Sequence, residues 1–384
     1  MADVSTASTA GHVSDLSRRT SGVKLSATEA LGLRMRSLLL DGSAPRFDSV
    51  AGVVEWFGAM QAQDLGSGLW SLGVRLPDFT IADVRAGLER REALRTWPMR
   101  GTVHFVPARD ARWMLELTGV KALAGAEYRR RNNGLDEATA NRAVDALAAA
   151  LTGGNQLTRA KCLAAIEQAG ITTTAQRGYH LLWYASQLGV TCIGPNIGTE
   201  QTFVLLDEWA PNPNRPDREE AMATLATRYF RSHGPATLKD FAGWTGFGLG
   251  EARTAIAAAG PDVVPVEVDG TEMFAGPQAA GIGPATGVLV LPGFDEYLLG
   301  YKDRSLMVAD DHVQAIVPGG NGMFRATIVR DGRVVGTWKR KSASKTKTVL
   351  DVMPLVTLRK RDHAAIAKAF EGYERYLGQR VEFG

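Results

Sequence analysis

Apolar residues in the first quarter of the chain recur every three or four positions, which is the spacing of one helix face. Three helices are expected there, and they open at Ser26, Ser49 and Thr80, because each of these residues can cap a helix N-terminus. The pattern then changes to two short strands, 94–98 and 102–106, joined by a turn. Three helices followed by a β-hairpin predict a winged-helix motif.

The same order of helices and hairpin is predicted a second time. Thr158 caps one helix, residues 173–188 form another, and residues 190–193 and 202–206 form the hairpin. The second helix is expected to turn Leu181 and its apolar neighbours inward and His180 outward.

A third copy follows the segment 211–216, which is rich in proline and asparagine. Thr237 opens a helix with a capping box, residues 249–259 form another helix, and Asp269-Gly270 is a two-residue hairpin turn. The copies share architecture rather than sequence, so we predict a structural repeat.

From Gly287 onward the apolar residues alternate at every second position, which predicts strands. The expected strands are 288–291, 324–330, 333–340 and 346–353, followed by a helix that carries Ile366, Phe370, Tyr373 and Leu377. The fold class is therefore α+β, with tandem winged-helix motifs followed by a C-terminal β-barrel or curled sheet with a terminal helix. The expected units are a disordered tail (1–24), a first winged helix with a glutamine motif (25–110), a helical connector with a second winged helix (111–210), a third winged helix (217–282) and the β-barrel domain (286–384).

Composition narrows the classes of protein to which the chain can belong. The 384 residues are 45% hydrophobic and 22% charged, as in ordinary globular proteins, and the formal net charge is +3. A polyanionic partner therefore requires a local basic patch. The two cysteines, Cys162 and Cys192, form no metal-spaced cluster with the six histidines, so we expect neither a metal nor another cofactor.

Targeting features favour a cytoplasmic, nucleoid-associated protein. No stretch of about twenty apolar residues predicts a membrane span. The first twenty-odd residues are rich in Ser, Thr, Ala and Gly and contain no apolar core, which is typical of a disordered tail rather than a signal peptide. Three tandem motifs in one chain also suit a monomer better than a dimer that reads a palindrome.

Polar residues begin abruptly at Gln61-Ala62-Gln63, where the second expected helix runs out. The preceding apolar residues place Gln61 at or just past the helix C-terminus, and Leu65-Gly66-Ser67-Gly68 is not expected to continue a helix. Two amides that lie two residues apart can hold one water molecule between them. The alternative is an ordinary pair of surface glutamines, since a lone Gln-x-Gln is a weak motif.

Cationic candidates for DNA contact lie on two predicted hairpins and one helix. Arg95, Arg100 and His104 lie on or beside the first hairpin, where a wing can reach phosphates. A turn position for Arg100 and a hydrogen bond within the sheet for His104 explain them equally well. The late hairpin and the segment after it carry a denser group, which favours a cationic hairpin that enters a groove. The members of that group are Lys339, Arg340, Lys341, Lys345 and Lys347, and the candidate on the helix is Arg177.

Other features have structural explanations of at least equal weight. Asp64 can supply negative charge beside the glutamines, but it can equally cap a local turn. Trp97 is more typical of a core residue than of a base-stacking platform. A polar network that holds the barrel to the helical part is expected from Asp295, Asp303 and Arg304.

Taken together, several segments resemble the AlkZ and YcaQ type of bacterial DNA glycosylases, from about residue 24 to the C-terminus. Gln61-Ala62-Gln63 matches the Gln-x-Gln motif of the AlkZ branch, where the YcaQ branch has Gln-x-Asp. The other matching segments are Trp97-Pro98-Met99-Arg100-Gly101-Thr102-Val103-His104, Leu291-Pro292-Gly293-Phe294-Asp295, Asp303-Arg304 and Gly336-Thr337-Trp338.

The resemblance implies tandem winged-helix motifs and a C-terminal β-barrel wrapped around duplex DNA. It also implies hydrolysis of the N-glycosidic bond of N7-alkylated, bulky or crosslinked guanines, with Gln61 and Gln63 as the catalytic residues. Many relatives are known only as winged-helix DNA-binding proteins, which keeps a transcriptional regulator or architectural binder as the alternative.

Two neutral amides can support glycosidic hydrolysis only if the leaving group is already activated. Glycosidic cleavage passes through an oxocarbenium-like transition state that a carboxylate usually stabilises. An amide cannot do so strongly, but it can fix the position of a water molecule. An N7-alkylguanine is cationic and leaves as a neutral base, so positioned water suffices for it. A crosslinked guanine cannot leave the stack freely, so we expect an open cleft and an approach through the minor groove.

Overall fold

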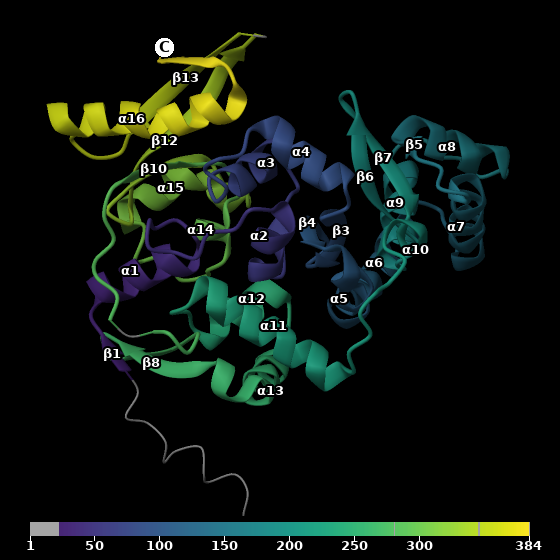
Figure 1. Ribbon diagram of the computed structural model, residues 1–384. Helices are drawn as coiled ribbons and strands as arrows, with labels where there is room; N and C mark the ends of the chain where they lie inside the picture. Colours follow the sequence, from purple (N-terminus) through teal and green to yellow (C-terminus); the bar gives the residue numbers. More distant parts are fainter. Residues whose placement is uncertain (1–22, 280, 345, 384) are drawn as a thin grey trace, which may run out of the picture.

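The computed structural model describes residues 23–279, 281–344 and 346–383 (Figure 1). Its first elements are β1 (Val23–Leu25), α1 (Ala27–Ser37), α2 (Val50–Phe57), β2 (Met60–Gln61), α3 (Leu65–Gly73), α4 (Ile81–Glu89), β3 (Ala93–Met99), β4 (Thr102–Pro107), α5 (Ala111–Thr118), α6 (Val120–Asn132), α7 (Glu137–Leu151), β5 (Leu157–Thr158), α8 (Arg159–Gln168), α9 (Arg177–Gln187), β6 (Thr191–Ile197) and β7 (Glu200–Leu205). The remaining ones are α10 (Leu206–Trp209), α11 (Arg218–His233), α12 (Leu238–Thr245), α13 (Leu249–Ala259), β8 (Val264–Val268), β9 (Thr271–Ala275), β10 (Val288–Leu291), α14 (Glu296–Leu299), α15 (Val313–Ile316), β11 (Ala326–Arg330), β12 (Arg333–Ala343), β13 (Lys347–Pro354), α16 (Lys360–Leu377) and β14 (Arg380–Phe383). The predicted α+β class is confirmed.

The helix starts predicted from capping residues are confirmed, whereas the helix predicted to begin at residue 173 begins at Arg177. Ser26, Thr80 and Thr237 each form a capping box, in which the side chain at the cap and an acidic side chain three residues later satisfy two backbone N–H groups. Ser49 and Thr158 cap α2 and α8 through their hydroxyl groups. Local hydrogen bonding therefore fixes where these helices begin.

The first two predicted hairpins, β3–β4 and β6–β7, join into one six-stranded sheet with the order β2-β4-β3-β6-β7-β5. Arg95 of β3 pairs with Ile193 of β6 where the hairpins meet. At one edge, β2 places Gln61 beside His104 of β4. The glutamine motif therefore begins in an edge strand, because α2 already ends at Phe57.

The third hairpin, β8–β9, pairs with a strand from the beginning of the chain. Val23, Lys24 and Leu25 of β1 pair in parallel with β8, beside α11, α12 and α13 (Figure 1). The prediction of a disordered tail over residues 1–24 is therefore wrong for Val23 and Lys24. Residues 1–22 lie outside the described part of the chain.

The C-terminal strands form a five-stranded sheet with the order β10-β11-β12-β13-β14. Within the described residues, β10 and β14 do not pair, so the sheet is curled and open rather than a closed barrel. The sequence patterns did not predict β14, which pairs in parallel with β13. The helix α16 packs against this sheet, and the β12–β13 hairpin projects beyond it (Figure 1).

The glycine-rich segment after the glutamines forms α3, contrary to the prediction that helical structure would not continue there. A Cβ on Gly68 would lie 2.9 Å from the ring of Phe105, and one on Gly73 would lie 2.4 Å from the ring of Tyr376. The glycines therefore allow α3 to fit between the first hairpin and α16. Close packing outweighs the weak helix preference of glycine here.

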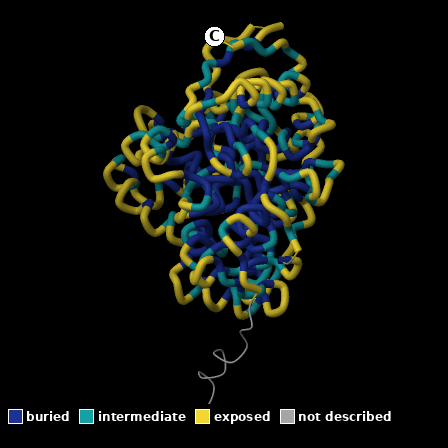
Figure 2. Tube along the Cα trace, turned by 90° about the vertical axis from the view of Figure 1, so that its left-hand side faces the viewer, coloured by how far each residue is buried: buried dark blue, intermediate teal, exposed yellow. Residues whose placement is uncertain are grey.

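Buried residues form a continuous core in the middle of the molecule, with exposed residues around its periphery (Figure 2). Trp97 belongs to this core and is 3% exposed. His180, predicted to face outward, is also buried and stacks near Tyr184. Among the helices of the described chain, none is long and apolar enough to cross a membrane.

Candidate active site

Gln61 is anchored to a buried carboxylate at the edge of the six-stranded sheet. Its backbone N–H donates to Glu296 Oε1 at 2.8 Å. Glu296 is 2% exposed and is the first residue of α14, directly after Asp295, the N-cap of that helix. The fold therefore joins two segments that lie far apart in the sequence.

Glu296 forms no ion pair with an arginine or lysine of the described chain. Its Oε2 lies 3.1 Å from Trp244 Nε1 and 3.2 Å from His233 Nε2. Burial opposes ionisation, but the hydrogen bond and charge of His233 outweigh it and lower the pKa of Glu296 to about 2. The carboxylate is therefore ionised at neutral pH, and the N–H groups around it all donate.

His104 is fully buried beside Gln61, so its side chain is not placed to touch a phosphate. Its Nδ1 lies 2.9 Å from the carbonyl oxygen of Thr102, which can only accept, so Nδ1 carries the hydrogen. Burial and the charge of Arg100 lower the pKa of His104 to about 4. The neutral ring therefore presents Nε2 as a hydrogen-bond acceptor.

Two buried hydrogen-bond acceptors, one from Gln61 and one from His104, lie on the same face of the sheet at this edge. Gln61 and His104 are paired residues of β2 and β4, and such pairs have Cβ atoms about 4.5–5.5 Å apart. Gln61 Oε1 and His104 Nε2 are both buried and have no hydrogen-bond partner among the described residues. Because a buried acceptor without a donor is costly, the arrangement suits a water molecule, whose two O–H groups match the two acceptors.

Gln63 lies at the same edge but is exposed. Its Oε1 accepts a hydrogen bond from the backbone N–H of Val103 at 3.1 Å. The two glutamines therefore contact successive residues of β4, Val103 and His104. The structure brings both to one edge of the sheet, with Gln61 directed inward and Gln63 toward solvent.

Asp64 caps α3, which is the structural role expected for it as the alternative to a catalytic one. Its Oδ1 accepts a hydrogen bond from the backbone N–H of Ser67 at 2.7 Å, at the N-terminus of α3. Capping alone accounts for an acidic residue at this position.

Apart from Arg340 on the late hairpin, the arginines predicted to contact DNA have different surroundings. Arg95 is half-buried in the middle of β3. Arg100 is exposed at the turn of the first hairpin, and its Nη1 donates to the carbonyl oxygen of Gly243 at 3.4 Å. Arg177 is half-buried at the start of α9. Arg100 is the one that occupies the tip of a hairpin.

Among the described basic residues near the C-terminus, Lys339, Arg340 and Lys341 lie on β12, and Lys347 begins β13. Lys339 pairs with Asp351 at 3.2 Å, and Lys347 pairs with Glu382 at 2.7 Å. Acidic neighbours therefore offset part of the positive charge. Lys345 lies outside the described residues.

A groove of about 620 Å³ lies between the start of α3 and the C-terminal sheet. Asp64 lines it on one side, and Arg325, Lys339 and Arg340 line it on the other. Lys341 is exposed beyond Arg340 and forms no ion pair with the described residues. Through Asp64, the groove therefore connects the glutamine segment, residues 61–64, with the basic residues of the β12–β13 hairpin.

Asp295, unlike Glu296, is neutralised by an arginine. Arg75 donates to both of its carboxylate oxygens, at 2.8 and 3.0 Å, and both side chains are almost completely buried. This pair holds the C-terminal part to the helical part, as predicted for Asp295. Asp303 and Arg304 do not join it and bond to other backbone groups.

The sequence patterns did not single out Glu296, His233 or Trp244. The available signal was that Glu296 follows Asp295 in one of the segments that resemble the glycosylase family. Within the described residues, no three His, Cys, Asp or Glu side chains are grouped so that they can hold a metal ion.

Three comparisons with known proteins give related results. The sequence profile of the family described as "DNA glycosylase AlkZ-like" matches residues 54–376. A curated protein of Streptomyces sahachiroi, "Interstrand DNA cross-link repair glycosylase", is 27% identical over 266 residues, which cover 64% of this chain and 70% of that protein. The solved structure of Streptomyces sahachiroi DNA glycosylase AlkZ has a TM-score of 0.77 and 25% identity, covering 94% of this chain and 100% of that one.

Proposed function

Because the chain belongs to the AlkZ-like DNA glycosylase family, we propose that it hydrolyses the N-glycosidic bond of N7-alkylated guanine in duplex DNA. The substrates include bulky and crosslinked adducts, in keeping with the cross-link repair for which the Streptomyces relative is named. Gln61 and Gln63 position the attacking water. The reaction is monofunctional, so the DNA strand stays intact.

The observation that carries this proposal is the pair of buried acceptors at the sheet edge. Gln61 and His104 are paired residues of β2 and β4, and neither Gln61 Oε1 nor His104 Nε2 has a hydrogen-bond partner among the described residues. We infer that each accepts one hydrogen bond from the same water molecule. As the C1′–N9 bond breaks, its electron pair goes to the cationic base, which leaves neutral. The water oxygen bonds to C1′, and its proton passes to His104 Nε2 and then to solvent. A weak base is sufficient because water bonded to an oxocarbenium carbon is acidic.

Glu296 supplies the negative charge that the two amides lack. It holds the backbone of Gln61 and lies ionised beneath it, without a lysine or arginine partner among the described residues. A charge in a site with little water acts more strongly on a developing cation than it would in bulk solvent.

Replacing Glu296 by glutamine is expected to slow base release about tenfold or more. The amide NH₂ would face either the N–H of Gln61 or that of Trp244, and the negative charge would be lost. Single-turnover release and DNA affinity should be measured together. Glu272→Gln, at an exposed carboxylate on β9, is the control and should leave the rate unchanged. Equal rates for Glu296→Gln and wild type would remove Glu296 from the mechanism.

Replacing Asp64 by asparagine is expected to leave base release within about twofold of wild type. Asparagine caps a helix as well as aspartate does, so only the charge is lost. Asp64→Ala, which removes the cap, should destabilise the protein by about 1 kcal/mol. Thermal melting and single-turnover release separate these effects. A large rate loss in Asp64→Asn at unchanged stability would assign the charge a catalytic role.

Duplex DNA is proposed to lie across α3 and α4, between the projecting β12–β13 and β6–β7 hairpins (Figure 1). The groove of about 620 Å³ gives a bulky adduct room beside the glutamine segment. The adduct itself projects into the major groove, so the glutamines are proposed to approach the sugar from the minor-groove side.

Replacing Lys341 by alanine is expected to weaken duplex binding and to reduce the slope of log affinity against log salt concentration by about 0.9. Lys341 lies on the projecting hairpin and has no acidic partner among the described residues, so its ammonium group can pair with a DNA phosphate. Lys24→Ala on β1, remote from this hairpin, is the control and should leave the slope unchanged. Identical salt slopes for Lys341→Ala and wild type would place the DNA elsewhere.

The direct test of the proposed function is incubation of wild-type protein with duplex DNA that contains one 7-methylguanine. Free 7-methylguanine should appear, and alkali should then cleave the strand at the abasic site. Duplex binding without release of 7-methylguanine or of a bulky N7-alkylguanine would leave a DNA-binding protein and refute the glycosylase assignment.

A further inference from the structure

A small cavity of about 170 Å³ lies between α3, α4, β12 and α16. Two guanidinium groups line it, Arg85 of α4 and Arg340 of β12, and no acidic side chain of the described chain does so. Most of the remaining wall is apolar or aromatic and includes Leu69 and Tyr376. Two cations that share one small space repel each other unless an anion lies between them, so the cavity suits an anionic group.

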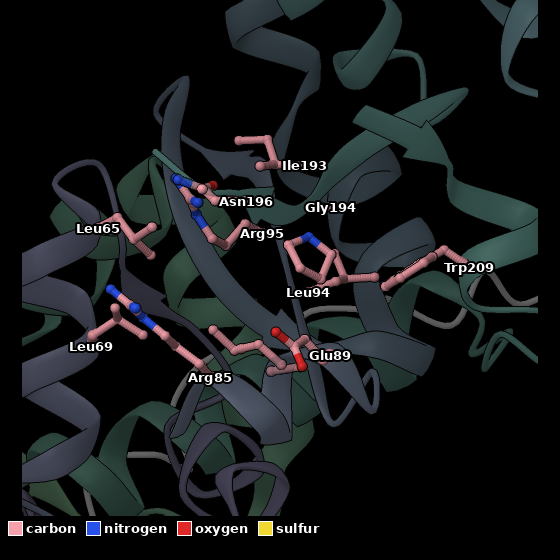
Figure 3. Close-up of a pocket in the computed structure, with 14 residues that line it drawn as sticks. Leu65, Leu69, Arg85, Glu89, Leu94, Arg95, Ile193, Gly194, Asn196 and Trp209 are labelled. Carbon is pink, nitrogen blue, oxygen red and sulfur yellow. The ribbon is translucent and has the colours of Figure 1, made fainter. Parts of the chain in front are cut away.

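Arg85 has no partner of its own for its positive charge. It is exposed on α4 and forms neither an ion pair nor a hydrogen bond with the part of the chain that the structure describes. Figure 3 shows its guanidinium beside Leu69, at one end of a neighbouring cavity of about 260 Å³. Glu89 also lines that neighbouring cavity and disfavours an anion there. An anion bound by Arg85 is therefore expected in the cavity of about 170 Å³.

Arg340 is held at this cavity by a tyrosine. Its Nη2 donates a hydrogen bond to Tyr373 Oη at 2.8 Å. Tyr373 is 3% exposed and lines the same cavity, and the hydrogen of its hydroxyl group has no acceptor among the described residues. The cavity therefore offers two guanidinium groups and a free O–H donor. Such donors match the oxygens of a phosphate group, which arginine binds through paired N–H groups.

We propose that this cavity binds one phosphodiester group of the substrate DNA, held between Arg85 and Arg340. Its size favours a phosphate group over a larger ligand, since pockets for drug-sized molecules measure about 300–1,000 Å³. The inference rests on the proposed function, which places duplex DNA across α3 and α4. A backbone phosphate is the part of an intact duplex that can enter such a cavity while every base stays in the stack.

The cavity lies near the glutamine segment. Leu65 lines it and follows Gln61 closely in the sequence, which limits the distance between their Cα atoms to about 14 Å. Phosphates follow one another about every 3.4 Å along the axis of each strand, so the bound phosphate should lie within about four positions of the lesion. The cavity also adjoins the groove of about 620 Å³, because Gly66 and Tyr373 line both. A phosphate held here fixes the register of the duplex, so that the sugar of the lesion reaches Gln61 without displacement of a crosslinked guanine.

The test combines arginine variants with duplexes in which one phosphate at a time is replaced by a neutral methylphosphonate. Each duplex carries one 2′-fluoroarabino 7-methylguanine, whose glycosidic bond resists hydrolysis, so that affinity is measured in a single register. The variants are Arg85→Gln and Arg340→Gln. Arg90→Gln is the matched control, because Arg90 is exposed at the end of the same helix and pairs with Glu92. Melting temperatures confirm that each variant is folded.

Wild type should lose about tenfold in affinity when the methylphosphonate occupies one particular position near the lesion. Arg85→Gln should bind the duplex with all its phosphates about tenfold more weakly than wild type and lose nothing further at that position. Arg340→Gln should show the same pattern. Each of these variants should also reduce the slope of log affinity against log salt concentration by about 0.9, while Arg90→Gln keeps the slope and the profile of wild type.

The inference is overturned if Arg85→Gln matches wild type, or if it binds more weakly but keeps the sensitivity of wild type at every phosphate position. In the second case its charge acts only at a distance. A wild-type profile in which no phosphate position stands out also overturns the inference. If wild type binds DNA but releases no 7-methylguanine from a hydrolysable duplex, the proposed function fails, and the affinities and salt slopes still decide whether the two arginines hold a phosphate.

Discussion

Replacing Gln61 by alanine is expected to slow the release of 7-methylguanine about a hundredfold or more, with little change in DNA affinity. The variant removes Oε1, one of the two acceptors proposed to hold the water. It keeps the backbone N–H that donates to Glu296, so the sheet edge and its anchor remain intact. Single-turnover kinetics on a duplex with one lesion gives the rate, and titration with the same duplex gives the affinity.

Two further variants sharpen this result. Gln63→Ala should also slow release, because Gln63 accepts from the backbone N–H of Val103 and so holds the strand that carries His104. Since the two glutamines hold the same edge of the sheet, the double variant should lose less than the sum of the two effects in free energy. Gln168→Ala, at the exposed end of α8, serves as the control. A Gln61→Ala variant that binds DNA and releases base at the wild-type rate would contradict the proposed role.

Replacing Asp295 by alanine is expected to lower the free energy of unfolding by about 3–5 kcal/mol. Arg75 would keep its charge in a site where its side chain is 0% exposed, without the carboxylate that bonds to it at 2.8 and 3.0 Å. Denaturant unfolding with a matched thermal melt measures the loss. The double variant Arg75→Met with Asp295→Leu should recover much of the stability, because no unpaired charge stays buried. Unchanged melting in Asp295→Ala would show that the pair does not hold the two parts together.

Adjacent carboxylates thus have opposite roles in this account. Asp295 is neutralised by Arg75 and holds the C-terminal sheet to the helical part. Glu296 has only neutral or histidine donors around it in the described structure and keeps its charge beneath Gln61. The pairing of each carboxylate, rather than its burial, separates the structural residue from the proposed functional one.

Much of the fold follows from local sequence signals. Capping residues such as Ser26 and Thr237 mark helix starts because their side chains satisfy backbone N–H groups within three residues. Asp269-Gly270 marks a hairpin because both residues adopt positive φ. The strands β1 and β14 and the helix α3 depend instead on partners distant in the sequence, so local patterns did not reveal them.

The candidate site was predictable in its central motif and not in its surroundings. Gln61 and Gln63 stand out as polar residues that follow an apolar run. Glu296 could be identified only from the fold, which places its Oε1 2.8 Å from the backbone nitrogen of Gln61. The sequence left two roles open for His104, a phosphate contact and a hydrogen bond within the sheet, and the structure shows the second, because the register of β4 turns His104 inward. The face of a strand that is buried depends on tertiary packing, which residue type alone does not reveal.

The measurement that tests the central claim most directly compares two duplexes that differ only in the charge of the lesion. One carries 7-methylguanine, and the other carries its ring-opened derivative, which has lost the positive charge. Water positioned by amides should suffice for the cationic base alone, so wild type should release the first and leave the second in place over the same time. Release of both at similar rates, or binding of the first duplex without release, would contradict the account.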